Sequence, residues 1–152
     1  MKPINLLQAA GFATVMLGAI ALGQASAAEV NTGYFGNVAI EGYDAVAYFT
    51  LGKATKGSDT FTRDWGGATW YFASAENRDR FAANPEAYAP QFGGLCAEGV
   101  AFHEVTVNIE PEVFAIVDGK LYFTAATAFA DLPGNLPNAV KNWPEVHGVL
   151  VQ

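Results

Sequence analysis

The stretch "GATWYFASAENRDRFAANPEAYAPQFGGLC", residues 67–96, carries the local signals that decide the fold. At its start, Gly66 and Gly67 separate two runs that are rich in aromatic residues and threonine. A two-residue Gly-Gly loop suits the left-handed turn that joins antiparallel strands. The sequence therefore predicts a β-hairpin that closes at these two glycines.

Beyond this hairpin the periodicity of the sequence becomes helical. Ser74 is a favourable N-cap for a helix over residues 75–83, and Glu76 in the first turn places a negative charge at the positive end of the helix dipole. Asn84 and Pro85 end this helix and begin a second short helical turn, because proline is favoured at the first helical position.

The rest of the chain adds a second hairpin and a proline-rich tail. Within "VFAIVDGKLYF", residues 113–123, the pair Asp118-Gly119 is a strong turn signal between two strands. The tail "LPGNLPNAVKNWPEV" contains three prolines and predicts one short helix near residues 136–142. Together these elements predict the α+β class, as a small single domain of short antiparallel β-hairpins packed with short helices.

The N-terminal segment has the layout of a secretory signal peptide. Lys2 precedes an apolar run over about residues 9–22, and Ala25-Ser26-Ala27 supplies a small-x-small cleavage pattern. The apolar run is shorter than the roughly 20 residues that span a bilayer, and no pair of arginines precedes it. We therefore predict a cleaved Sec-type signal peptide at residues 1–27, a periplasmic or secreted protein, and no stable membrane insertion after cleavage. An uncleaved N-terminal anchor is the alternative.

Cleavage leaves one domain of ordinary size. We predict a flexible mature N-terminus at residues 28–37, a folded domain at 38–147 and a C-terminal tail at 148–152. Removing the signal takes away Lys2 and no acid, so the net charge changes from −7 to −8. Such an acidic surface repels phosphate backbones and anionic lipids, so we expect no nucleic-acid partner. The sequence leaves the oligomeric state open.

Cys96 is the only cysteine of the chain, and His103 follows it by seven positions. An unpaired cysteine in an exported protein is buried, binds a ligand, reacts, or pairs between chains. Thiolate and imidazole together favour copper or zinc. On a helix, residues seven apart face the same way, since two turns take about 7.2 residues. Two ligands do not complete a tetrahedral zinc site, so copper is favoured over zinc, with His147 as a further candidate ligand.

The words "GYDAVAYF", "GATWYFASAENRDRFAANPEAYAPQFGGLC" and "PEVFAIVDGKLYF" occur in this order, and with them the sequence resembles the YHS domain family. It looks most like exported single-domain members, and the resemblance covers nearly all of the mature chain. Tyr71 and Ser74 match the tyrosine and serine of the family's name. The resemblance implies a compact α+β fold related to the metal-binding TRASH domains.

The resemblance also implies which positions would bind metal. Metal-handling members carry cysteines near the first turn and around the helix start, and those positions here are Ala47, Ala73 and Asn77. Because none of them has a thiol, the same metal site cannot form. The predicted metal ligands are therefore Cys96 and His103, with copper as the metal, zinc less favoured, and a metal ion or a metal-handling protein as the partner.

Two alternatives remain beside metal binding. In the first, the chain is a structural module, or a ligand- or protein-binding one, with Cys96 buried and inert. In the second, less favoured, it is a thiol-dependent enzyme in which His103 is the base. No resolving cysteine accompanies Cys96, so we favour a protein that is not an enzyme.

Three further features have structural interpretations. Asp44 is expected to cap a turn or to accept hydrogen bonds from backbone amides. Gly93-Gly94 is favoured as a bend with positive φ over a close approach to a bound group. The tyrosines have polar tips that could line a ligand pocket.

Overall fold

The computed structural model describes residues 30–32, 36–102, 109–127 and 129–150. The confirmed class is α+β, with the following order of elements: η1 (Ala39–Gly42), α1 (Ala45–Thr50), β1 (Ser58–Trp65), β2 (Ala68–Phe72), α2 (Ala75–Ala83), α3 (Pro85–Tyr88), η2 (Gln91–Gly94), α4 (Ala97–Ala101), β3 (Phe114–Val117), β4 (Lys120–Phe123), η3 (Phe129–Asp131) and α5 (Leu132–Leu150). The predicted signal peptide lies outside these residues.

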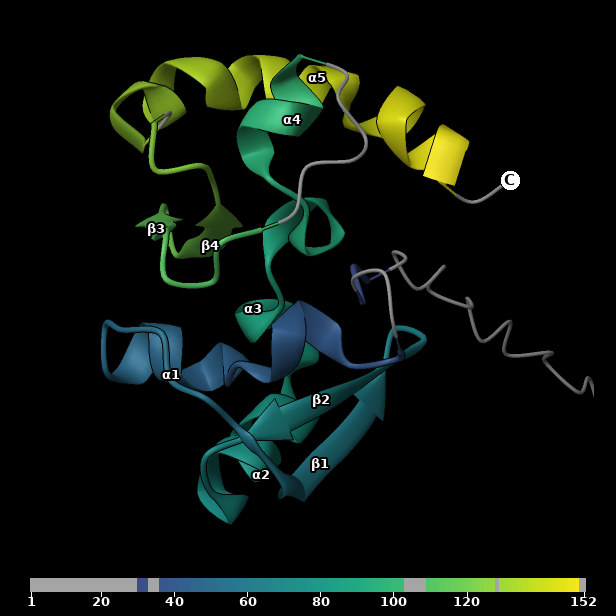
Figure 1. Cartoon of the computed structure of the whole chain (residues 1–152), viewed down its shortest axis with the longest axis vertical. Helices are drawn as coiled ribbons and strands as arrows, with labels where there is room; N and C mark the ends of the chain where they lie inside the picture. Colours follow the sequence, from purple (N-terminus) through teal and green to yellow (C-terminus); the bar gives the residue numbers. More distant parts are fainter. Residues whose placement is uncertain (1–29, 33–35, 103–108, 128, 151–152) are drawn as a thin grey trace, which may run out of the picture.

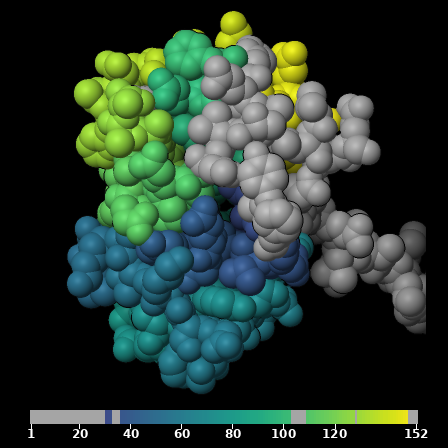
Figure 2. Space-filling model, in the orientation of Figure 1, coloured from purple at the N-terminus to yellow at the C-terminus, as the bar shows by residue number. Residues whose placement is uncertain are grey.

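The elements separate into two halves along the long axis of the molecule (Figure 1). The helices α1 and α2 and the hairpin β1–β2 form one end, whereas α4 and α5 form the other, and α3 lies between them. Each sheet has two antiparallel strands, β1–β2 and β3–β4. The space-filling view shows the two halves in contact, with the early chain below and the later chain above (Figure 2).

Both predicted hairpins are confirmed. In the first, Trp65 pairs with Ala68 across Gly66 and Gly67, whose φ angles are 62° and 77°. In the second, the turn residues Asp118 and Gly119 have φ angles of 50° and 73°. Two consecutive positive φ angles match the twist of the flanking strands, which is why glycine is favoured at these positions.

The predicted helix over 75–83 is also confirmed. The Ser74 hydroxyl accepts a hydrogen bond from the Asn77 backbone N–H at 3.2 Å, as expected of an N-cap. The second helical turn, α3, begins at Pro85. The predicted bend at Gly93-Gly94 is present too, with φ angles of 61° and 81°.

The length predicted for the helix in the tail was wrong. Instead of one short helix near 136–142, α5 runs for 19 residues with Pro137 and Pro144 inside it. Each internal proline removes a backbone hydrogen bond, so the helix depends on its packing against α4. Three residues spaced by seven face that contact and are buried, namely Leu132, Ala139 and Val146.

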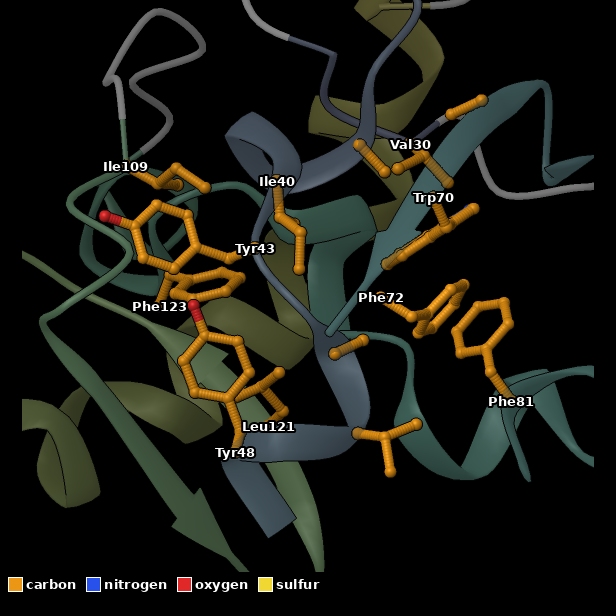
Figure 3. Packing of buried hydrophobic residues seen from close by; sticks show 14 residues of the cluster. Val30, Ile40, Tyr43, Tyr48, Trp70, Phe72, Phe81, Ile109, Leu121 and Phe123 are labelled. Carbon is orange, nitrogen blue, oxygen red and sulfur yellow. The ribbon is translucent and has the colours of Figure 1, made fainter. Parts of the chain in front are cut away.

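Two clusters of buried side chains form the interior. The first core joins the two halves, because it combines Tyr48 of α1 and Phe72 of β2 with Leu121 and Phe123 of β4. Figure 3 shows Tyr48, Leu121 and Phe123 gathered on one side of this core and Phe72 with Phe81 on the other. The second core lies between α4 and α5.

Residues 30–32 and 36–37 of the segment expected to be a flexible N-terminus are within the described chain. Val30 is 9% exposed and belongs to the first core. The Asn31 backbone N–H donates to the Gly93 carbonyl at 2.7 Å. Among the residues that the structure describes, no helix combines the length and apolar character needed to cross a membrane.

Candidate functional site

Cys96, the predicted metal ligand, lies at the N-terminus of α4 and is only 2% exposed. Its backbone forms an isolated parallel bridge with Phe123 of β4. Within the described part of the chain, no three His, Cys, Asp or Glu side chains come close enough together to hold a metal ion. The thiol is therefore positioned as a buried group of the interior between α4 and β4.

His103, the predicted partner of Cys96, lies outside the described residues. The residue before it, Phe102, is the C-cap of α4, and Cys96 is the N-cap. A rise of 1.5 Å per residue separates the Cα atoms of these two caps by about 9 Å. The pairing of Cys96 with His103 stays a prediction.

His147, the further candidate ligand, lies on α5 beside Trp143, with 5.1 Å between the ring centroids. Its Nε2 atom is buried and has no hydrogen-bond partner among the described residues. The structure places this imidazole in the second core region but does not bring it into a metal-binding group within the described chain.

The three positions at which the resemblance implies cysteines meet around a different side chain, that of Asp44. Its carboxylate accepts from the backbone N–H of Ala47 at 3.2 Å and of Ala73 at 2.9 Å, and from Asn77 Nδ2 at 2.7 Å. A fourth donor is the Val46 N–H, at 2.9 Å. The expectation that Asp44 caps a turn is confirmed, and the carboxylate is also the junction between α1, β2 and α2.

Asp44 is completely buried. A buried carboxylate is costly unless hydrogen bonds replace its hydration, and here four protein donors do so. Because these donors already occupy both carboxylate oxygens, Asp44 has a structural role at the junction of α1, β2 and α2. The region where the resemblance implies cysteines is, in this chain, a buried carboxyl group that accepts hydrogen bonds from amides.

A second polar contact ties the 109–113 segment to the first half of the chain. The Tyr43 hydroxyl donates to Glu112, and Lys56 Nζ lies 3.9 Å from the centroid of the Tyr43 ring. The hydrogen bond to Glu112 raises the pKa of Tyr43, and the same bond lowers the pKa of Glu112. Burial raises the pKa of Tyr48, whose hydroxyl donates to the Pro111 carbonyl at 2.9 Å. Through these hydrogen bonds, the two tyrosines hold the 109–113 segment against the first half of the chain.

A comparison with protein families matches residues 46–92 to the YHS domain. This segment of the chain is similar to the YHS domain. The matched segment includes Tyr71 and Ser74 and also the Asp44 partners Ala47, Ala73 and Asn77, and it covers just under a third of the chain. Neither the curated proteins nor the solved structures contain a significant match.

The YHS family is associated with metal binding. In this chain the match ends at Phe92, so Cys96 and His103 both follow the YHS segment. The YHS segment itself contains no cysteine. Any thiolate ligand must therefore come from the part of the chain that lies beyond the matched residues.

Sequence reasoning missed a cavity beside the YHS segment. The aromatic residues that line the cavity are Trp65, Trp70, Phe92 and Trp143, and no tyrosine is among its described lining residues. The sequence offered only a weak signal, two tryptophans flanking the Gly-Gly turn. Trp143 is too distant in the chain for any local pattern to connect it with them.

Proposed function

We propose that this protein is an exported, non-catalytic YHS-domain protein that binds copper through Cys96 and His103. The observation that supports the proposal most is that the single thiol of a YHS-domain chain lies just beyond the YHS segment, at the start of α4. In this proposal the protein works in the periplasm or outside the cell. Its partner is the metal ion itself or a metal-handling protein.

Copper is favoured by the chemistry of the donors. A thiolate is a soft ligand that selects Cu(I), and Cu(I) is satisfied by fewer ligands than the four of a structural zinc site. Cys96 is buried, and Ala97 and Val100, which follow it in α4, are buried members of the second core. A dry, apolar environment supports a low-coordinate Cu(I) site because no water competes for the metal.

A Cu(I) competition titration against a chromophoric chelator tests this function. We expect Cys96→Ser to weaken Cu(I) binding by more than about 100-fold, since loss of a direct ligand exceeds the 10- to 100-fold effect of an outer-shell change. His103→Ala should weaken it as well, and His147→Gln measures whether the second imidazole of the chain contributes. If wild type and Cys96→Ser compete equally poorly, the copper function is wrong.

A second candidate function is a ligand-binding module with an inert thiol. The 2% exposure of Cys96 supports it, and so does the aromatic cavity.

Thiol labelling tests whether Cys96 is buried and unreactive in the native protein. Because the side chain is buried, we expect a bulky aromatic disulfide reagent to label the native protein more than about tenfold more slowly than the urea-unfolded protein. The measurement is the release of the coloured thiol over time. Equal rates in the native and unfolded protein would contradict an inert, buried cysteine.

A further inference from the structure

The aromatic cavity lies where the two halves of the chain meet. It has a volume of about 210 Å³. Trp65 and Trp70 line it from the β1–β2 hairpin, and Phe92 and Trp143 line it from η2 and α5. All three tryptophans of the chain therefore contribute to one cavity.

The aromatic walls are held in place before any ligand arrives. Trp65 and Trp70 have ring centroids 5.9 Å apart, and both pack on Phe81, at 5.8 and 4.8 Å. Phe92 and Trp143 form a second pair at 5.6 Å. The Trp70 Nε1–H donates to the Trp65 carbonyl at 2.9 Å. Trp70 itself is completely buried, so it supports the cavity wall from behind.

The charges around the cavity have one sign. Among the lining residues that the structure describes, Glu86 is the one with a charged side chain; it is exposed, and no described cation pairs with it. The whole chain carries a net charge of −7. Aromatic faces and a carboxylate attract a cation, whereas an anion would meet repulsion from both.

The size of the cavity limits the ligand. An engineered cavity of about 150 Å³ binds benzene, so this one accommodates a molecule slightly larger than benzene. A strongly hydrated primary ammonium would lose its hydration in such a cavity without gaining enough hydrogen-bond acceptors in return. A methylated ammonium loses little hydration, and its methyl groups pack on the rings.

We propose that this cavity binds a small quaternary or methylated ammonium compound, with the rings of Trp65 and Trp143 against the cation and Glu86 as its counter-charge. This site is separate from the proposed copper ligands. Choline binding by Cys96→Ser should therefore equal that of wild type, and the failure of either proposal leaves the other intact.

Titrating the purified protein with choline and with its neutral carbon isostere, 3,3-dimethylbutan-1-ol, tests the proposal. Tryptophan fluorescence and calorimetry report binding. We expect choline to bind saturably and about tenfold more tightly than the isostere, because only the charged compound gains the cation–π attraction. Equal affinities, or no saturable choline binding at millimolar concentration, would overturn the proposal.

Variants locate the site. Trp143→Leu should weaken choline binding by about tenfold and change isostere binding little. Glu86→Gln, an exposed change that leaves packing intact, should weaken choline binding a few-fold and remove most of its dependence on salt. Glu110→Gln is the matched control, because Glu110 is exposed and does not line the cavity. Equal losses in the two glutamine variants would show a non-specific charge effect and overturn the role of Glu86.

Discussion

Replacing Asp44 with alanine is expected to lower the free energy of unfolding by about 4 kcal/mol. The change removes the N-cap of α1, which is worth about 1 kcal/mol. It also leaves the part-buried donors Ala73 N–H and Asn77 Nδ2 without the oxygen of a buried acceptor, and an unsatisfied donor costs about 1–3 kcal/mol where water cannot take the acceptor's place. The large effect follows from complete burial, since no water replaces the lost carboxylate.

Urea unfolding, with the slope of the transition held equal between variants, measures this loss. The matched control is Asp79→Ala. Asp79 pairs with Arg78 at 2.8 Å, but the pair is exposed, so we expect a change below about 1 kcal/mol. The loss in free energy of unfolding for Asp44→Asn should lie between the losses for Asp44→Ala and Asp79→Ala. The asparagine oxygen still accepts hydrogen bonds, but its NH₂ group faces other donors. A loss below about 1 kcal/mol for Asp44→Ala would contradict the role of Asp44 as the junction.

Replacing Gly57 with alanine is expected to destabilise the protein by at least about 3 kcal/mol. A Cβ atom at this position would lie 2.4 Å from the carbonyl carbon of Tyr71, 2.6 Å from its oxygen and 2.7 Å from the Phe72 nitrogen. These are backbone atoms of β2 and cannot rotate away. The Gly57 N–H also donates to the Gly42 carbonyl at 2.8 Å, so moving the chain aside would break that bond.

Gly134→Ala is the same substitution with the opposite expected result. Gly134 lies in α5, and a Cβ there meets no atom within 4 Å. Alanine should therefore stabilise the protein by about 0.5–1 kcal/mol, through the lower conformational entropy of the unfolded chain. Thermal and urea unfolding of both variants give the comparison. Equal and small effects would mean that β2 shifts to make room at Gly57.

The sequence predicted the elements that depend on neighbouring residues. The Gly66-Gly67 and Asp118-Gly119 turns and the Ser74 cap were correctly placed because each depends on backbone dihedral angles or on one local hydrogen bond. The helix in the tail was predicted too short because its length depends on tertiary packing. Its prolines argue locally against a long helix, and burial against α4 outweighs that preference.

For the candidate site, too, some features were predicted from the sequence and others depend on tertiary contacts. From the sequence came the YHS family, the one thiol at Cys96 and the lack of cysteine at Ala47, Ala73 and Asn77. That Asp44 would cap a turn was also expected, because Val46 and Ala47 follow it directly. No sequence pattern indicated that Ala73 and Asn77 would bind the same carboxylate, since that contact requires β2 and α2 to fold back onto α1.

By itself, the sequence determined the local turns, the caps, the resemblance to the YHS family, and a set of candidate metal ligands that contains a single thiol. The tertiary structure decided that Cys96 is buried, that Gly57 must have no side chain, and that Trp143 joins Trp65 and Trp70 around one cavity. The physical reason is the range of the interactions. Turns and caps are fixed within a few residues, whereas burial and cavities arise only when distant segments pack together and exclude water.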